Sequence, residues 1–84
     1  DTAVLGEVDV RTRGVRRVVV LPRGAEYHVW LSDGSALISG NGVLYRWAEG
    51  RLETFVDLRS RGIRDVSRLA LSADGTHLAI VGAD

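Results

Sequence analysis

The feature that most constrains the fold of this chain is an internal repeat. The stretch LALSADGTHLAIVG, residues 69–82, holds a turn signal between two alternating apolar runs, and a looser copy, VWLSDGSALISG, occupies residues 29–40. The turn residues recur in the same order: Ser32, Asp33 and Gly34 first, then Ser72, Asp74 and Gly75, with Ala73 as the extra residue and Leu37 matched to Leu78. A period of about forty residues indicates stacked structural units, none of which buries its apolar face alone.

The local pattern predicts strands throughout. Apolar and polar residues alternate nearly everywhere, glycine-bearing turns follow at short intervals, and no helical spacing lasts for three turns. Asp-Gly and Asn-Gly pairs between such runs are typical of tight hairpin turns, because these residues tolerate a positive φ. The chain is therefore expected to be all-β, with eight short strands. The turn residues that this pattern predicts are Asp33, Gly34, Asn41, Gly42, Asp74 and Gly75.

The strands group into one complete unit with half a unit on either side. Residues 1–21 are expected to form an outer hairpin, 27–58 a complete four-stranded unit, and 66–84 an inner hairpin. VRRVVVLPRG, from Val15, corresponds to LETFVDLRSRG, from Leu52, and each is a strand followed by a loop that contains Arg-Gly. The chain thus contains two equivalents of one four-stranded antiparallel unit.

These units resemble the blades of a β-propeller. VSRLALSADGTHLAIVGAD resembles the first half of a WD-repeat or TolB-type blade, and YHVWLSDGSALISGNGVLYRW extends the likeness to Trp47. Ala48 stands where the WD-repeat family has aspartate, and no Gly-His precedes Tyr27 or Val66, which favours a generic bacterial propeller. The resemblance implies an all-β propeller fragment with strand order c-d, a-b-c-d, a-b. It implies no activity.

Incomplete units at both ends favour assembly with other chains. A half blade has an unpaired edge and an uncovered face, so the last hairpin of one copy is expected to pair with the first hairpin of the next. With two blade equivalents per chain, a homotrimer or homotetramer has about six or eight blades. Three alternatives remain open at this point: an excised part of a larger propeller attached to a peptidase-like or TolB-like enzyme, an engineered or evolutionary-model self-assembling propeller, and a monomeric barrel or sandwich. The start at Asp1 without methionine favours a processed or excised fragment.

Composition excludes several other sources of stability and several partners. The chain has 84 residues, no cysteine and two separated histidines, His28 and His77, so neither disulfides nor a structural metal is expected. Its 11 basic residues balance 11 acidic ones, which favours neither nucleic acid nor an anionic membrane. No apolar run has the length of a membrane span. The expected partners are further copies of the chain and, beyond these, a protein or peptide.

The chain offers few candidates for chemistry. No nucleophile with a base and an orienting acid is apparent, so neither enzymatic activity nor a cofactor is predicted. The aromatic residues Trp30, Tyr45 and Trp47 lie on expected strands, where packing between blades is their default role. Arg59, Arg61 and Arg64 share one connection, and repeated around a ring they would suit an anion or an acidic peptide.

Overall fold

The computed structural model describes residues 3–83, and these form eight strands and one short 3₁₀ helix. Residues 1, 2 and 84, the outermost residues of the two predicted terminal hairpins, lie outside the described residues. In chain order the elements are β1 (Val4–Val8), β2 (Val15–Val20), β3 (Ala25–Trp30), β4 (Ala36–Gly40), β5 (Val43–Ala48), β6 (Arg51–Asp57), η1 (Leu58–Arg61), β7 (Arg64–Leu71) and β8 (Leu78–Ala83).

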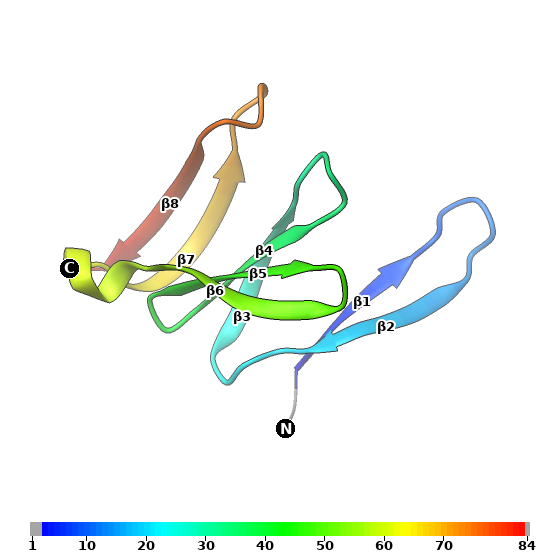
Figure 1. Cartoon of the computed structure of the whole chain (residues 1–84), viewed down its shortest axis with the longest axis horizontal. Helices are drawn as coiled ribbons and strands as arrows, with labels where there is room; N and C mark the ends of the chain where they lie inside the picture. The colour runs from blue at the N-terminus through cyan, green and yellow to red at the C-terminus, as the bar shows by residue number, and fades with distance from the viewer. Residues whose placement is uncertain (1–2, 84) are drawn as a thin grey trace.

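The described strands form three antiparallel sheets. The first hairpin pairs β1 with β2, the middle sheet has the order β3-β4-β5-β6, and the third sheet pairs β7 with β8. Figure 1 shows the three sheets next to one another, with the four-stranded sheet between the two hairpins. The molecule is flattened, with overall extents of 42 × 35 × 20 Å. The predicted all-β, antiparallel architecture is confirmed. The described strands form three separate sheets and not a closed barrel.

The first hairpin repeats the outer half of the middle sheet residue by residue. Between β1 and β2, Leu5 is opposite Val19 and the next pair skips Val18, which is an extra residue in the ladder. Between β5 and β6, Leu44 is opposite Val56 and the next pair skips Phe55. Such a β-bulge bends the strand and increases its twist. The closing hydrogen bonds also correspond: Leu21 N donates to Ala3 O at 2.9 Å, and Leu58 N donates to Gly42 O at 2.8 Å.

The third sheet repeats the inner half of the middle sheet, with one correction to the alignment made from sequence. Both turns begin alike, because Gly34 N donates to Leu31 O and Gly75 N donates to Ser72 O. The bonds that close the two turns have the same length, 2.8 Å, but span different numbers of residues: Leu31 N donates to Ser35 O, whereas Ser72 N donates to His77 O, one residue further on.

The extra residue therefore lies after the glycine, at Thr76, and not at Ala73. The strand pairs confirm this shift, since Trp30 is opposite Ala36 and Leu71 is opposite Leu78. Leu78 corresponds to Ala36 and Ser72 corresponds to Leu31, so the sequence-based matches of Leu78 with Leu37 and of Ser72 with Ser32 were wrong. The list of equivalent positions becomes Ala36 with Leu78, Leu37 with Ala79, Ile38 with Ile80, Ser39 with Val81 and Gly40 with Gly82.

The core consists of two apolar clusters, one on each face of the middle sheet. Leu5 of the first hairpin packs with Ala25, Ala36 and Ile38 on one face, and the last two side chains are fully buried. Leu44 and Leu58 pack with Val66 of the third sheet on the other face. Because both faces are covered, every residue of β4 is buried, a pattern typical of a central strand rather than of an exposed sheet.

Candidate assembly and binding surfaces

The arginine-bearing connection is a capped 3₁₀ turn. Asp57 precedes η1 and accepts the Arg59 amide at 3.0 Å, and Gly62 closes the turn in the left-handed conformation with φ 75°. The Arg59 guanidinium donates to both oxygens of Asp57, from Nε at 3.0 Å and from Nη2 at 2.8 Å. These bonds lower the pKa of Asp57 below its usual value. Arg59 is therefore held by its own neighbour.

The three arginines predicted as an anion-binding group differ in their surroundings. Arg64 pairs with Asp65 at 2.7 Å, as Arg59 pairs with Asp57. Arg61 is exposed and makes no ion pair with any described residue. Within one chain, two of the three guanidinium groups already have a carboxylate partner, so Arg61 is the member of this group that an incoming anion would meet first.

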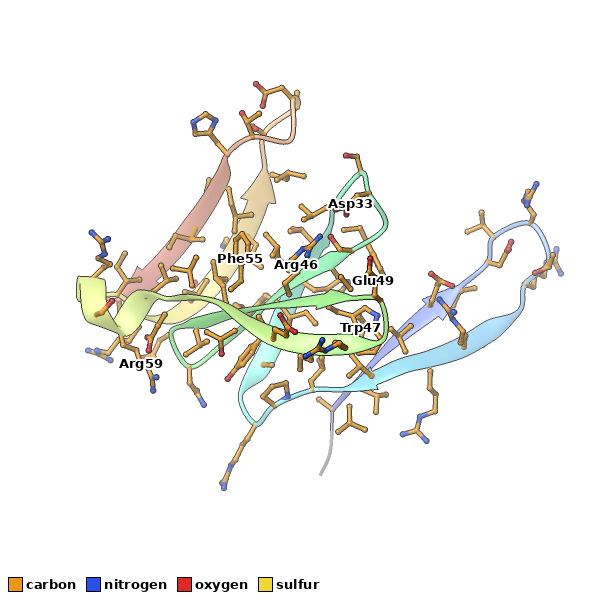
Figure 2. The ribbon with its side chains drawn as sticks, in the orientation of Figure 1. Asp33, Arg46, Trp47, Glu49, Phe55 and Arg59 are labelled. Atoms are coloured by element: carbon orange, nitrogen blue, oxygen red, sulfur yellow. The ribbon has the colours of Figure 1, made fainter. Side chains whose placement is uncertain are left out.

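The three aromatic residues predicted to pack between units fall into two groups. Tyr45 and Trp47 are half-buried and pack against the cluster that joins the first hairpin to the middle sheet. Trp30 lies on β3 and is 40 % exposed, so a large apolar side chain remains uncovered at the inner half of the same sheet face. Figure 2 places Trp47 on the part of the middle sheet nearest the first hairpin.

The Asp-Gly turns are held by hydrogen bonds to the aspartates. Asp33 Oδ1 accepts the Ser35 amide at 2.9 Å and the Ser35 hydroxyl at 2.5 Å, and these bonds lower its pKa. Asp74 Oδ1 accepts the hydroxyls of Ser72 and Thr76, each at 2.7 Å, and the Thr76 amide at 3.0 Å, which lowers its pKa to about 2. Both aspartates thus act as turn residues.

The Asn-Gly turn joins β4 to β5 and also holds a neighbouring loop. Asn41 and Gly42 both have positive φ, 54° and 82°. Asn41 Nδ2 donates to Arg23 O at 3.0 Å, which ties this turn to the loop between the first hairpin and the middle sheet. The side chain of Asn41 lies so close to Gly24 that a Cβ there would meet it at 2.5 Å. Gly24 is therefore favoured by its positive φ of 83°, and any other residue there would displace the Asn41 side chain.

Shallow grooves follow the inner strands and the turns. One, of about 350 Å³, lies between β3 and β7 and is lined by Tyr27, His28, Ser67, Arg68 and Leu69. A second, of about 260 Å³, lies at the turn end of the middle sheet, where Asp33, Arg46 and Glu49 are found (Figure 2). Among residues 3–83 no group of three or more metal-ligating side chains gathers, and no helix there has the length and apolar character of a membrane span.

Sequence reasoning missed the exposed apolar side chains and one buried hydroxyl. Phe55 is 54 % exposed, Val81 is 54 % exposed, and several valines of the first hairpin are equally uncovered. Alternation alone does not reveal this, because it cannot say which face has a neighbour. Ser39 is almost fully buried, and its Oγ has no hydrogen-bond partner among the described atoms.

Comparison with known proteins adds no relative. No protein-family model matches the chain, and no curated protein or solved structure is significantly similar to it. The class is thus defined by the fold alone: an all-β chain of antiparallel sheets, in which a complete four-stranded sheet lies between two hairpins that repeat its two halves.

Proposed function

We propose that this chain is a β-propeller segment that assembles with further copies of itself into a closed ring, which serves as a non-enzymatic binding scaffold. The observation that carries this proposal is the arrangement of free edges. β8 repeats β4, and β1 repeats β5, yet β4 and β5 pair with each other whereas β8 and β1 each lack that partner among the described strands. Pairing β8 of one copy with β1 of another would complete a second four-stranded sheet.

The register of that missing pair follows from the middle sheet. Leu37 is opposite Arg46 and Ser39 is opposite Leu44 in the β4–β5 ladder. Transferred through the equivalent positions, Ala79 lies opposite Glu7 of the next copy, and Val81 lies opposite its Leu5. An unpaired edge is a template for another chain, and repeat units need neighbours to bury their apolar faces. Head-to-tail contacts of this kind form a closed ring when the rotation between neighbouring copies closes, and an open filament when it does not.

The binding surface in this proposal is the set of inner strands and their loops. Within one chain β3 and β7 lie side by side and form the groove that contains Tyr27, His28 and Arg68. A ring would repeat this groove between β7 of one copy and β3 of the next. Its mixture of an aromatic ring, an imidazole and a guanidinium suits a protein or peptide partner better than a buried small molecule.

Disulfide trapping tests the ring directly, because the natural chain has no cysteine. In the double variant Ala79→Cys/Glu7→Cys the two exposed positions are opposite each other between copies, about 5 Å apart at Cα, within the reach of a disulfide. Oxidation should give a covalent ladder that ends at a closed trimer or tetramer. Val81→Cys/Glu7→Cys is the matched control, since these positions are diagonal and about 7–8 Å apart. Equal ladders from both variants, or monomer alone, would contradict the proposal.

A further inference from the structure

Two side chains at equivalent positions, Val18 and Phe55, differ in their exposure to solvent. Val18 and Phe55 are the extra residues of the two corresponding bulges, in the first hairpin and in the middle sheet. Val18 and its neighbour Val19 are half-buried against the cluster of the next sheet. Phe55 is 54 % exposed, and its neighbour Val56 is 38 % exposed. The same position is half-buried in the first hairpin and exposed to solvent in the middle sheet.

Phe55 and Val56 are exposed because the sheet next to them has fewer described strands than the middle sheet. Val18 and Val19 are half-buried against a cluster on which Trp47 and Leu52 also pack, and these two are cross-strand partners in the outer half, β5–β6, of the middle sheet. The sheet next to Phe55 is the third sheet, which has only the inner pair β7–β8 among the described residues. Figure 2 shows Phe55 on the side of β6 toward the third sheet and away from the first hairpin.

The chain itself carries the outer half that this surface lacks. Val8 and Val15 are cross-strand partners at the positions equivalent to Trp47 and Leu52. They are 59 % and 76 % exposed. Side chains alternate between the two faces of β1. Leu5 and Glu7 lie on the face toward the middle sheet of the same chain, so Val8 lies on the opposite face. The first hairpin thus presents an apolar pair to the outside, in the position that would cover Phe55 and Val56 in a neighbour.

We propose that Val8 and Val15 of one copy pack on Phe55 and Val56 of the adjacent copy, forming the outer half of the interface between them. This inference rests on the proposed ring. Pairing β1 of the second copy with β8 extends the third sheet by two strands, over the uncovered part of the middle sheet. The occupant of the Phe55 surface is therefore a second copy of this chain.

Side-chain size supports this choice of occupant. Inside the chain the large Trp47 and Leu52 of the middle sheet and the small Val18 and Val19 of the first hairpin pack against the same buried cluster. Between copies the sizes are exchanged: the small Val8 and Val15 lie over the larger Phe55 with Val56. Each contact thus combines one aromatic ring with valines, which keeps the packed volume similar, as close packing requires.

The inner half of the interface has the same property. Trp30 occupies the position equivalent to Leu71 and is 40 % exposed within one chain. The residues that would face it in another copy are Ala70 and Ala79, which are exposed. In the corresponding contact inside the chain, Leu71 takes the place of Trp30, and Val29 and Leu37 take the places of Ala70 and Ala79. Between copies, the larger Trp30 would therefore be matched by the smaller alanines.

A double-variant cycle tests the outer contact. Phe55→Glu and Val15→Arg are measured singly and together, and the concentration at which the assembly half-dissociates is read by light scattering. Each single change places a charge in an apolar contact and is expected to raise this concentration at least tenfold. The double variant brings opposite charges together across each interface and should recover part of the loss. The two residues lie on different sheets within one chain, so such coupling arises only between copies.

The matched control is Val10→Glu, since Val10 is 88 % exposed in the turn of the same hairpin and corresponds to Glu49. It should assemble as the natural chain does. Mixing the two single variants is a second readout. In an alternating ring, half of the interfaces join the introduced carboxylate to the introduced guanidinium, and the other half keep the natural pair of Phe55 and Val15. Recovery on mixing requires an even number of copies.

Three outcomes separate this inference from the proposed ring. If the natural chain forms the ring but both single variants dissociate as Val10→Glu does, the ring stands and the contact is wrong. The single variants can each raise the half-dissociation concentration while the double variant raises it by the product of the two factors. In that case the two surfaces do not contact each other. If the natural chain forms no ring, the proposed function fails, and the contact fails with it.

Discussion

Asp33 and Asp74 occupy the same position in the turns of two sheets, but among residues 3–83 only Asp33 has an arginine partner. Arg46 Nη2 donates to Asp33 Oδ2 at 3.1 Å, across from the β3–β4 turn. Among the described residues nothing donates to Oδ2 of Asp74. In the proposed ring the residue equivalent to Arg46 is Glu7 of the next copy, which is paired with Arg16 of its own hairpin at 3.0 Å.

Reversing this hairpin ion pair should tighten the assembly. Glu7→Arg/Arg16→Glu keeps an ion pair between the same positions and brings a guanidinium to Asp74 of the neighbouring copy, as Arg46 is brought to Asp33. An exposed pair of this kind is worth about 0.2–1 kcal/mol, so the dissociation constant of each interface should fall by up to about fivefold. The measurement is dissociation on dilution, and adding Asp74→Asn should remove the gain. A gain that survives Asp74→Asn would mean that the introduced guanidinium lies elsewhere.

Acid should weaken the β7–β8 turn in a defined pH window. The pKa of Asp74 is lowered to about 2 by the hydroxyls of Ser72 and Thr76 and by the Thr76 amide. A carboxylate with a depressed pKa stabilises the folded state above its unfolded pKa of about 3.9, and this contribution disappears as the pH falls through the folded value. The difference in stability between the natural chain and Asp74→Asn should therefore be constant above about pH 5 and shrink as the pH falls toward about 2. A carboxyl NMR titration of Asp74 near 3.9 would contradict the geometry of this turn.

Removing the buried hydroxyl of Ser39 should stabilise the fold. Its Oγ is buried without a partner among the described atoms, and an unsatisfied buried polar group costs about 1–3 kcal/mol. Ser39→Ala should raise the free energy of unfolding by about 1 kcal/mol, or the melting temperature by about 4–8 °C for a chain of this size. Ser35→Ala is the control, because the Ser35 hydroxyl donates to Asp33 and its loss should destabilise. A lower melting temperature for Ser39→Ala would show that the hydroxyl has a partner in solution.

Tryptophan fluorescence should report the inner contact between copies. Trp30 is 40 % exposed in one chain, whereas Trp47 is half-buried against its own core. In the variant Trp47→Phe, Trp30 is the sole tryptophan, and assembly should shift its emission to shorter wavelength and reduce quenching by acrylamide. Dilution below the dissociation concentration should reverse both changes. Emission that does not depend on concentration, in a chain shown to assemble, would exclude Trp30 from the interface.

The sequence predicted the strands well because their signals are local. Alternation and Asp-Gly or Asn-Gly turns are sufficient to place hairpins, and the antiparallel sheets follow from short connections. The alignment placed the extra residue at Ala73 instead of Thr76, because sequence similarity favours matching Leu37 to Leu78 whereas the turn hydrogen bonds decide the register. The helical turn after Asp57 was also expected as an irregular loop, since four residues carry too weak a pattern.

The surfaces were less predictable than the strands. The exposure of Phe55 and the burial of Val18 depend on which sheet has a complete neighbour, and that is a tertiary property. The pairing of Arg59 with Asp57 had a local signal, an aspartate two residues before an arginine at a turn, but such pairs are common and many do not form. Only the structure distinguishes an arginine that is paired with a carboxylate from one that can bind an incoming anion.

Whether copies of this chain close into a ring can be measured from the absolute mass of the natural chain in solution. Light scattering on a size-exclusion column across a dilution series should give one discrete species of three or four times the 9.1 kDa of a single chain, with no intermediate of two copies. That mass should persist on dilution until the dissociation concentration is reached. A well-folded monomer at every concentration would contradict closure between chains.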